Sequence, residues 1–269
     1  MFLTKKAFWK IAVIAICYVV LGGICIGSAI LFSNMGIDVK PLLVLGIIVY
    51  ALCPILILWG RYAEGKGKLI NLGNKLVRNE LKPAEFIKEY EILKNSKDLI
   101  INKPRLETLH LLAISYDSLD DRENCLATVD EMIATANENK KALANLIKVS
   151  FLFSYGKKEE AENLFNEAQK LKLNAVCNIL IDSILKSDRA MAMGDYKIVE
   201  AHNLKMLSQT FPKLDNLGKL IVNFTLGEVY EKLQDNEKAI FYYQYCENFG
   251  GETAIKSSAI SALERLQQN

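Results

Sequence analysis

Two long segments without a charged residue lie near the N-terminus and constrain the first quarter of the chain. The first segment covers positions 11–37, and the second covers positions 41–60. A helix rises about 1.5 Å per residue, so about 20 apolar residues cross a hydrocarbon layer about 30 Å thick. We therefore predict a transmembrane hairpin over residues 1–60, with spans at 11–32 and 42–59.

A cleaved signal peptide is the alternative interpretation of the first segment. Its apolar run is longer than the apolar region of a signal peptide, and a second apolar segment follows it. Pro41 stands at the expected start of the second helix, where the missing N–H of proline costs nothing. These features favour two retained spans over cleavage.

The basic residues that flank the two segments predict their orientation. Cytoplasmic loops of membrane proteins are enriched in Lys and Arg. Three such residues precede the first span and three follow the second, whereas the connecting loop has one: Lys5, Lys6, Lys10, Arg61, Lys66 and Lys68 against Lys40. We expect a multi-pass protein of the cell membrane with both termini in the cytoplasm. A body outside the cell is the alternative.

The charge distribution argues against a nucleic-acid partner. Residues 1–68 hold seven basic and two acidic residues, whereas residues 69–269 hold 26 basic and 29 acidic residues. A basic membrane-proximal segment followed by a faintly acidic body is typical of a membrane protein. Lys (27) exceeds Arg (6), and Ile and Asn are frequent, which indicates an AT-rich bacterial genome.

Gly23 and Gly27 form a small-residue pair within the first span. Such spacing allows two membrane helices to approach closely. The pair could join this chain to another copy or to a different subunit. The alternative is packing against the second span of the same chain, or no role in packing.

A polar, glycine-bearing stretch at 61–68 is interpreted as a linker, and a helical repeat follows over residues 69–269. The clearest unit runs through the residues Leu226, Gly227, Tyr230, Ala239, Tyr243 and Cys246. This pattern resembles the tetratricopeptide repeat, in which Leu-Gly and a Tyr on the first helix precede a small residue and an aromatic residue on the second. The same template recurs upstream through Tyr116, Ala161, Phe165 and Ala168.

The central small position of the repeat recurs at nearly even, slowly lengthening intervals, at Cys125, Ala161, Val199 and Ala239. A weaker unit precedes these, with Leu72, Gly73, Leu76, Phe86 and Tyr90. An amphipathic stretch at 253–266 is expected to cap the stack. The register around 179–211 stays open, because Asn203 replaces the expected aromatic residue.

The predicted fold class is therefore all-α: a two-helix transmembrane hairpin followed by a TPR-like α-α superhelical solenoid. Two helices of one unit cannot bury their apolar stripes alone, and stacking produces a continuous core.

The resemblance also implies a partner-binding groove, because the first helix of each pair lines a concave surface in this family. The positions that it places there are His110, Ile114, Asp117, Leu146, Ser150, Phe153, Ile184, Asp188, Phe224, Glu228 and Glu231. Apolar patches with acidic spots suit a peptide with basic residues. An ordinary solvated face is the alternative for these positions.

No motif in the sequence predicts catalysis, a cofactor or a metal site. Gly60–Gly67 falls one residue short of a P-loop and lacks the Ser or Thr that binds magnesium. Ser154 has a Lys three residues later, but the companion elements of an acylating serine site are missing. The two histidines, His110 and His202, have no metal-type residue three or four positions after them.

We therefore expect a non-enzymatic, membrane-tethered scaffold or adaptor that binds a protein or peptide partner through its cytoplasmic repeat domain. The alternative is an accessory subunit of a membrane complex, such as secretion or cell-envelope machinery, that assembles through the hairpin. The rival from another class is an enzyme or transporter component. The uncharged spans disfavour it, because ion pathways usually need intramembrane charges.

Overall fold

The computed structural model describes residue 22 and residues 67–95, 105–209 and 213–268. Apart from residue 22, both expected spans lie outside these residues, as do the Gly23–Gly27 pair and most of the linker. Within the part of the chain that is described, no helix is both long enough and apolar enough to cross a bilayer. The chain divides into two compact units, residues 1–67 with 96–102 and residues 68–95 with 103–269. The second unit contains the helical body.

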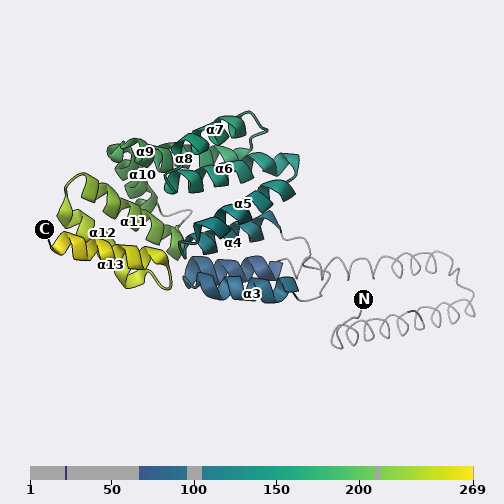
Figure 1. The fold of residues 1–269 in the computed structure, drawn as a ribbon, viewed down its shortest axis with the longest axis horizontal. Helices are drawn as coiled ribbons and strands as arrows, with labels where there is room; N and C mark the ends of the chain where they lie inside the picture. The colour runs from purple at the N-terminus through teal and green to yellow at the C-terminus, as the bar shows by residue number, and fades with distance from the viewer. Residues whose placement is uncertain (1–21, 23–66, 96–104, 210–212, 269) are drawn as a thin grey trace, which may run out of the picture. The chain divides into compact units, whose positions relative to one another are not determined.

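The body is built from helices (Figure 1). Residues 67–73 are helical and continue directly into a π-helix, so Gly67 and Lys68 belong to a helix and not to the linker. In order, the elements are η1 (Asn74–Asn79), α3 (Pro83–Asn95), α4 (Leu106–Asp117), α5 (Arg122–Thr135), α6 (Glu138–Ser154), α7 (Lys158–Gln169), α8 (Ala175–Lys186), α9 (Asp188–Met193), α10 (Tyr196–Ser208), α11 (Asn216–Lys232), α12 (Asn236–Phe249) and α13 (Ala254–Gln267). The expected all-helical fold is confirmed for the described residues.

The turns between paired helices repeat the same backbone geometry. One residue in each turn has a positive φ, and these residues are Asp120, Gly156, Gly194 and Gln234. In all four turns the next N–H donates to the carbonyl five residues earlier at 2.9 Å, which is a common way to end a helix. Each positive-φ residue lies five positions before the central small residue of its hairpin, so Gly194 fixes the register around 179–211.

The first hairpin follows the same plan with one inserted residue. Its positive-φ residue is Leu81, and the N–H of Lys82 donates to the carbonyl of Leu76 at 2.7 Å, one residue further back than in the other turns. The insertion lies in η1, whose π-helical turn accommodates an extra residue. Phe86 and Tyr90 of α3 are buried, so the weak unit at the start of the repeat region is a structural hairpin.

The residues that define the repeat form the core between paired helices. The side chains at the central small position are fully buried, and so are nearly all other repeat-defining residues: Cys125, Ala161, Val199, Ala239, Phe165, Ala168, Leu226, Tyr230, Tyr243 and Cys246. Tyr116 is half-buried. Gly227 is essential to this packing, because a Cβ there would lie 2.6 Å from the ring of Tyr243.

The fourth hairpin departs from the others because its first helix is broken. Ser187 ends α8 and begins α9, with φ −117° and ψ −76°. Asn203, which replaces the expected aromatic residue on α10, is buried and donates from Nδ2 to the carbonyl of Val199 at 2.9 Å. An internal hydrogen bond thus satisfies the polar group that the sequence places in the core.

The helical body closes on itself, because its last hairpin contacts its first. η1 packs against α11, and Asn216 Nδ2 donates to the carbonyl of Asn79 at 2.7 Å. The N–H of Glu252 donates to the carbonyl of Leu81 at 3.0 Å, and the N–H of Ala254 donates to that of Ser118 at 2.7 Å. An open solenoid would leave both ends free, whereas here the two ends satisfy each other's polar groups.

Candidate partner-binding surface

Three of the predicted groove residues lie in the core. Leu146, Phe153 and Ile184 are 0%, 4% and 0% exposed and belong to the apolar cluster between α6, α7 and α8. Their side chains are covered by neighbouring helices and present no surface to a partner.

Two further predicted groove residues form a hydrogen bond that joins one hairpin to the next. Ser150 on α6 donates from Oγ to Asp188 Oδ2 on α9 at 2.5 Å. Burial raises the pKa of Asp188 to about 6, and the hydrogen bond from Ser150 opposes that shift. Both side chains are half-buried, and their polar atoms are used inside the body.

Asp117 and Glu231 have the same role at other junctions. Asp117 accepts from the hydroxyl of Tyr155 on the next hairpin at 2.7 Å, and burial raises the pKa of this carboxyl. Glu231 accepts from Arg265 of α13 at 2.8 Å and from the hydroxyl of Tyr243 at 3.0 Å. Asp117 therefore holds two neighbouring hairpins together, whereas Glu231 holds α12 and α13 against α11.

His110 and Ile114 on α4 are half-buried. Burial lowers the pKa of His110 to about 4, and the positive charge of Arg78 adds to this effect. The imidazole is therefore neutral at physiological pH. Among the described residues, His110 belongs to no group of His, Cys, Asp and Glu side chains that could hold a metal ion.

The remaining predicted residues, Phe224 and Glu228, lie on one stripe of α11 together with Ile221. Ile221 is 44% exposed, and Phe224 is half-buried with its ring centroid 5.6 Å from that of Tyr243. The carboxylate of Glu228 makes no hydrogen bond within the described residues. Burial raises the pKa of Glu228 to about 7, and the charge of Glu231 adds to the rise. We call Ile221, Phe224 and Glu228 the α11 face.

Ile221 was missed in the sequence analysis, although its spacing was informative. Residues 221, 224 and 228 are three and four apart, which places them on one side of a helix. The family pattern named Phe224 as the first groove position on this helix. Ile221 lies one turn before it and was therefore not included.

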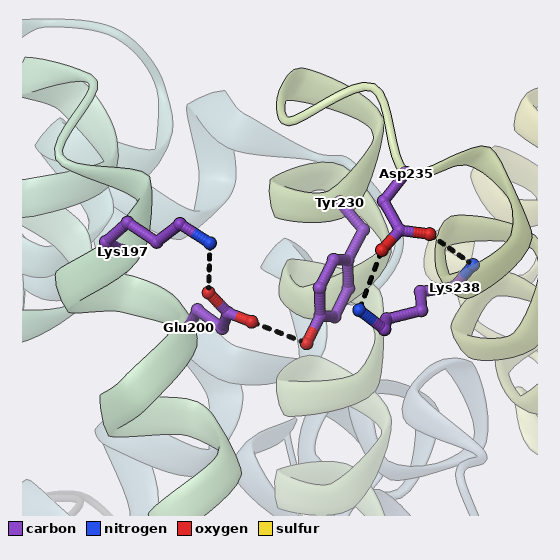
Figure 2. Close-up of polar contacts among 5 residues, drawn as sticks. All are labelled: Lys197, Glu200, Tyr230, Asp235 and Lys238. Atoms are coloured by element: carbon purple, nitrogen blue, oxygen red, sulfur yellow. Dashed lines mark hydrogen bonds and ion pairs between the residues drawn. The ribbon is translucent and has the colours of Figure 1, made fainter.

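A polar network on the other side of α11 fixes the orientation of this helix (Figure 2). The hydroxyl of Tyr230 donates to Glu200 of α10 at 2.8 Å, and Lys197 lies 3.1 Å from the same carboxylate. Lys238 of α12 lies 2.7 Å from Asp235 and 4.9 Å from the centre of the Tyr230 ring. Tyr230 thus ties α11 to both adjacent helices and holds the α11 face in place.

The serine and cysteine side chains that could act as nucleophiles are hydrogen-bonded or buried within the body. Ser154 Oγ donates to the carbonyl of Phe151 at 2.9 Å, and the thiols of Cys125, Cys177 and Cys246 are free and buried. Within the described ranges, His, Cys, Asp and Glu side chains form no group that could hold a metal ion.

One family comparison matches the chain, and it falls on the hairpin that carries the α11 face. The tetratricopeptide repeat pattern matches residues 221–246, which cover most of α11 and α12. No curated protein and no solved structure matches the chain. The match identifies a tetratricopeptide-like repeat at residues 221–246, and the repeated hairpins support a TPR-like arrangement in the rest of the body. Tetratricopeptide repeats generally serve in protein–protein interaction.

Proposed function

We propose that the chain is a non-enzymatic, membrane-tethered scaffold that binds a protein partner through the α11 face. The observation that carries the proposal is the position of the tetratricopeptide match, which includes all three residues of that face. Apart from the half-buried His110 and Ile114, the other predicted groove positions are buried or bonded to neighbouring helices. Ile221 is exposed, and Glu228 makes no hydrogen bond among the described residues.

The chemistry of the α11 face defines the partner segment. Ile221 and Phe224 offer an apolar contact, and Glu228 offers a half-buried carboxyl with a raised pKa. A Lys or Arg beside this carboxyl would lower its pKa and favour the charged form. We therefore expect a segment with one basic and one apolar side chain, as in an amphipathic helix or an extended peptide.

Membrane tethering forms part of the proposal on the strength of the sequence. The two uncharged segments, at positions 11–37 and 41–60, are long enough for transmembrane helices. Holding the repeat body at the cytoplasmic face would raise its effective concentration near membrane-bound partners without new contacts. Localisation at the cell membrane with both termini cytoplasmic is the arrangement that we propose.

Site-specific photo-crosslinking of the full chain in its host tests the proposal. A crosslinking residue replaces Phe224, and a control replaces Lys205, an exposed residue of α10. We expect one protein to be captured at 224 but not at 205, and Glu228→Lys should abolish that adduct by repelling a basic partner. Equal capture at both positions would contradict the proposal. Capture only from a span position, such as Ile26, would favour the accessory-subunit alternative.

A further inference from the structure

The outer side of α12 carries a stripe of aromatic side chains that the repeat core does not use. Phe241 and Phe249 are 67% and 61% exposed, and Tyr245 lies half-buried between them. Residues four apart lie on one side of a helix, so the three rings follow one line. We call Phe241, Tyr245 and Phe249 the aromatic stripe.

The stripe lies outside the side of α12 that packs into the body. The inward side chains, Ala239, Tyr243 and Cys246, are fully buried. The rings of Tyr245 and Phe249 contact each other, with centroids 4.9 Å apart. Single exposed apolar residues are common, but an ordered row of large aromatic residues is typical of an interaction surface.

The stripe has a symmetry that matches a second copy of itself. Its pattern, Phe-x3-Tyr-x3-Phe, reads the same in both directions about Tyr245. If two α12 helices pair antiparallel around a two-fold axis, Tyr245 meets Tyr245 of the second copy. Phe241 then meets Phe249 of the second copy at both ends. A two-fold interface requires this kind of self-complementary surface.

The charges beyond the stripe fit the same arrangement. Lys238 precedes Tyr245 by seven residues, and Glu252, in the turn after α12, follows it by seven. The two-fold axis therefore brings Lys238 of one copy toward Glu252 of the second copy, at both ends of the stripe. Both are exposed, and Glu252 forms no ion pair within the described residues. The pairing therefore places opposite charges at each end of the aromatic contact, where like charges would oppose it.

We propose that two copies of this chain associate through antiparallel pairing of their α12 helices along the aromatic stripe. The proposal goes beyond partner binding and does not depend on it, since the α11 face lies on another helix. A membrane tether, if present, would favour this contact by holding both copies in one layer.

Crosslinking between two tagged copies of the full chain tests the proposal. The two forms carry different tags and are produced in the same cells, with a photo-crosslinking residue in place of Tyr245. We expect an adduct that carries both tags, with the crosslink mapped to residues 236–249 of the second copy. Failure to form this adduct, or capture of a different protein instead, would overturn the proposal.

Two sets of variants, with the crosslinker kept at 245, separate specific pairing from chance contact. The double variant Phe241→Glu/Phe249→Glu should reduce the doubly tagged adduct at least tenfold, a change of about 1.4 kcal/mol in association. Ile179→Glu, at a side chain 72% exposed on α8, serves as the matched control and should leave the yield unchanged. An equal loss in the control would contradict a stripe-specific contact.

Charge reversal provides the second readout. Lys238→Glu and Glu252→Lys should each reduce the adduct, because each single change places like charges opposite each other at both ends. The double variant should restore the yield, since it exchanges the two charges. Lys238 also pairs with Asp235 of the same chain. If that were its only role, the double variant would not recover the adduct. Failure to recover the adduct would therefore overturn the proposed register.

Discussion

Arg78 Nη1 lies 2.9 Å from Asp215 Oδ2, and this ion pair joins the first and last hairpins across 137 residues of sequence. The two side chains are 35% and 26% exposed. Asp215 also begins α11, because its Oδ1 accepts from the N–H of Gly218 at 2.7 Å. One carboxylate therefore both caps the helix that carries the α11 face and holds that helix against η1.

A double-mutant cycle measures this ion pair. Asp215→Asn retains an oxygen for the helix cap but loses the charge, and Arg78→Met retains much of the side-chain length. We expect a coupling of about 0.5–1.5 kcal/mol, since the pair is partly exposed. The measurement is urea unfolding of a fragment of residues 68–269. Strictly additive effects of the two variants would show that the pair contributes nothing.

Ala239→Glu should destabilise the same fragment by about 2–4 kcal/mol. Ala239 is 0% exposed and lies in the contact between α12 and the rest of the body. The larger side chain overpacks that contact and buries a charge. Gln244→Glu introduces the same charge at an exposed position of α12 and serves as the control. An unchanged urea midpoint for Ala239→Glu would mean that the repeat register is wrong.

Gly227→Ala should cost about 1–3 kcal/mol, because the new methyl group would overlap the ring of Tyr243. The Cβ position lies 2.6 Å from the nearest ring carbon. Alanine favours helices more than glycine does, so propensity alone predicts the opposite sign. Thermal unfolding separates the two effects, with Lys232→Ala on the exposed side of α11 as the control. Stabilisation by Gly227→Ala would contradict the close contact.

Glu228→Gln should change the pH dependence of stability. The pKa of Glu228 rises from 4.5 to about 7 on folding, so the folded chain binds more protons across that range. The wild-type chain therefore loses stability as pH rises from about 4.5 to 7. The pKa of His110 is lowered to about 4, so its contribution to stability rises with pH below pH 6.5. This contribution is the same in the wild type and in the variant, and it cancels in their difference.

We expect Glu228→Gln to be more stable than the wild type by about 1–2 kcal/mol at pH 8 and equal to it at pH 4.5. Urea midpoints of the 68–269 fragment at the two pH values provide the measurement. A difference that is the same at both pH values would show that Glu228 is not held in a desolvated site.

Local sequence patterns predicted the paired helices because the repeat depends on short-range features. Each such feature depends on a single residue type at a fixed position in the repeat. Ala161 is the small buried residue of its hairpin, and Gly156 is the residue of the turn that has a positive φ. The amphipathic stretch at 253–266 is helical, in α13 (Ala254–Gln267). The contacting residues belong to the same hairpin. The number of residues between them in the sequence therefore indicates which side chains meet.

Features that depend on distant contacts could not be predicted in this way. The pairing of Arg78 with Asp215 leaves no periodic signal, because each residue resembles an ordinary surface charge in sequence. The burial of Leu146 and Phe153 follows from how α6 packs against α7 and α8, which the family pattern does not specify. The break at Ser187 was not predicted either, although the polar run at 186–189 interrupts the apolar periodicity there.

Hydrogen exchange at two backbone amides tests closure of the helical body most directly. The N–H groups of Glu252 and Ala254 donate to the carbonyls of Leu81 and Ser118, which lie far away in sequence in the first two hairpins of the body. Residue-resolved exchange on the full chain should find both amides protected, and Arg78→Met should speed their exchange while that of α6 stays unchanged. Exchange of both amides at the rate of an unfolded chain would contradict the closed body.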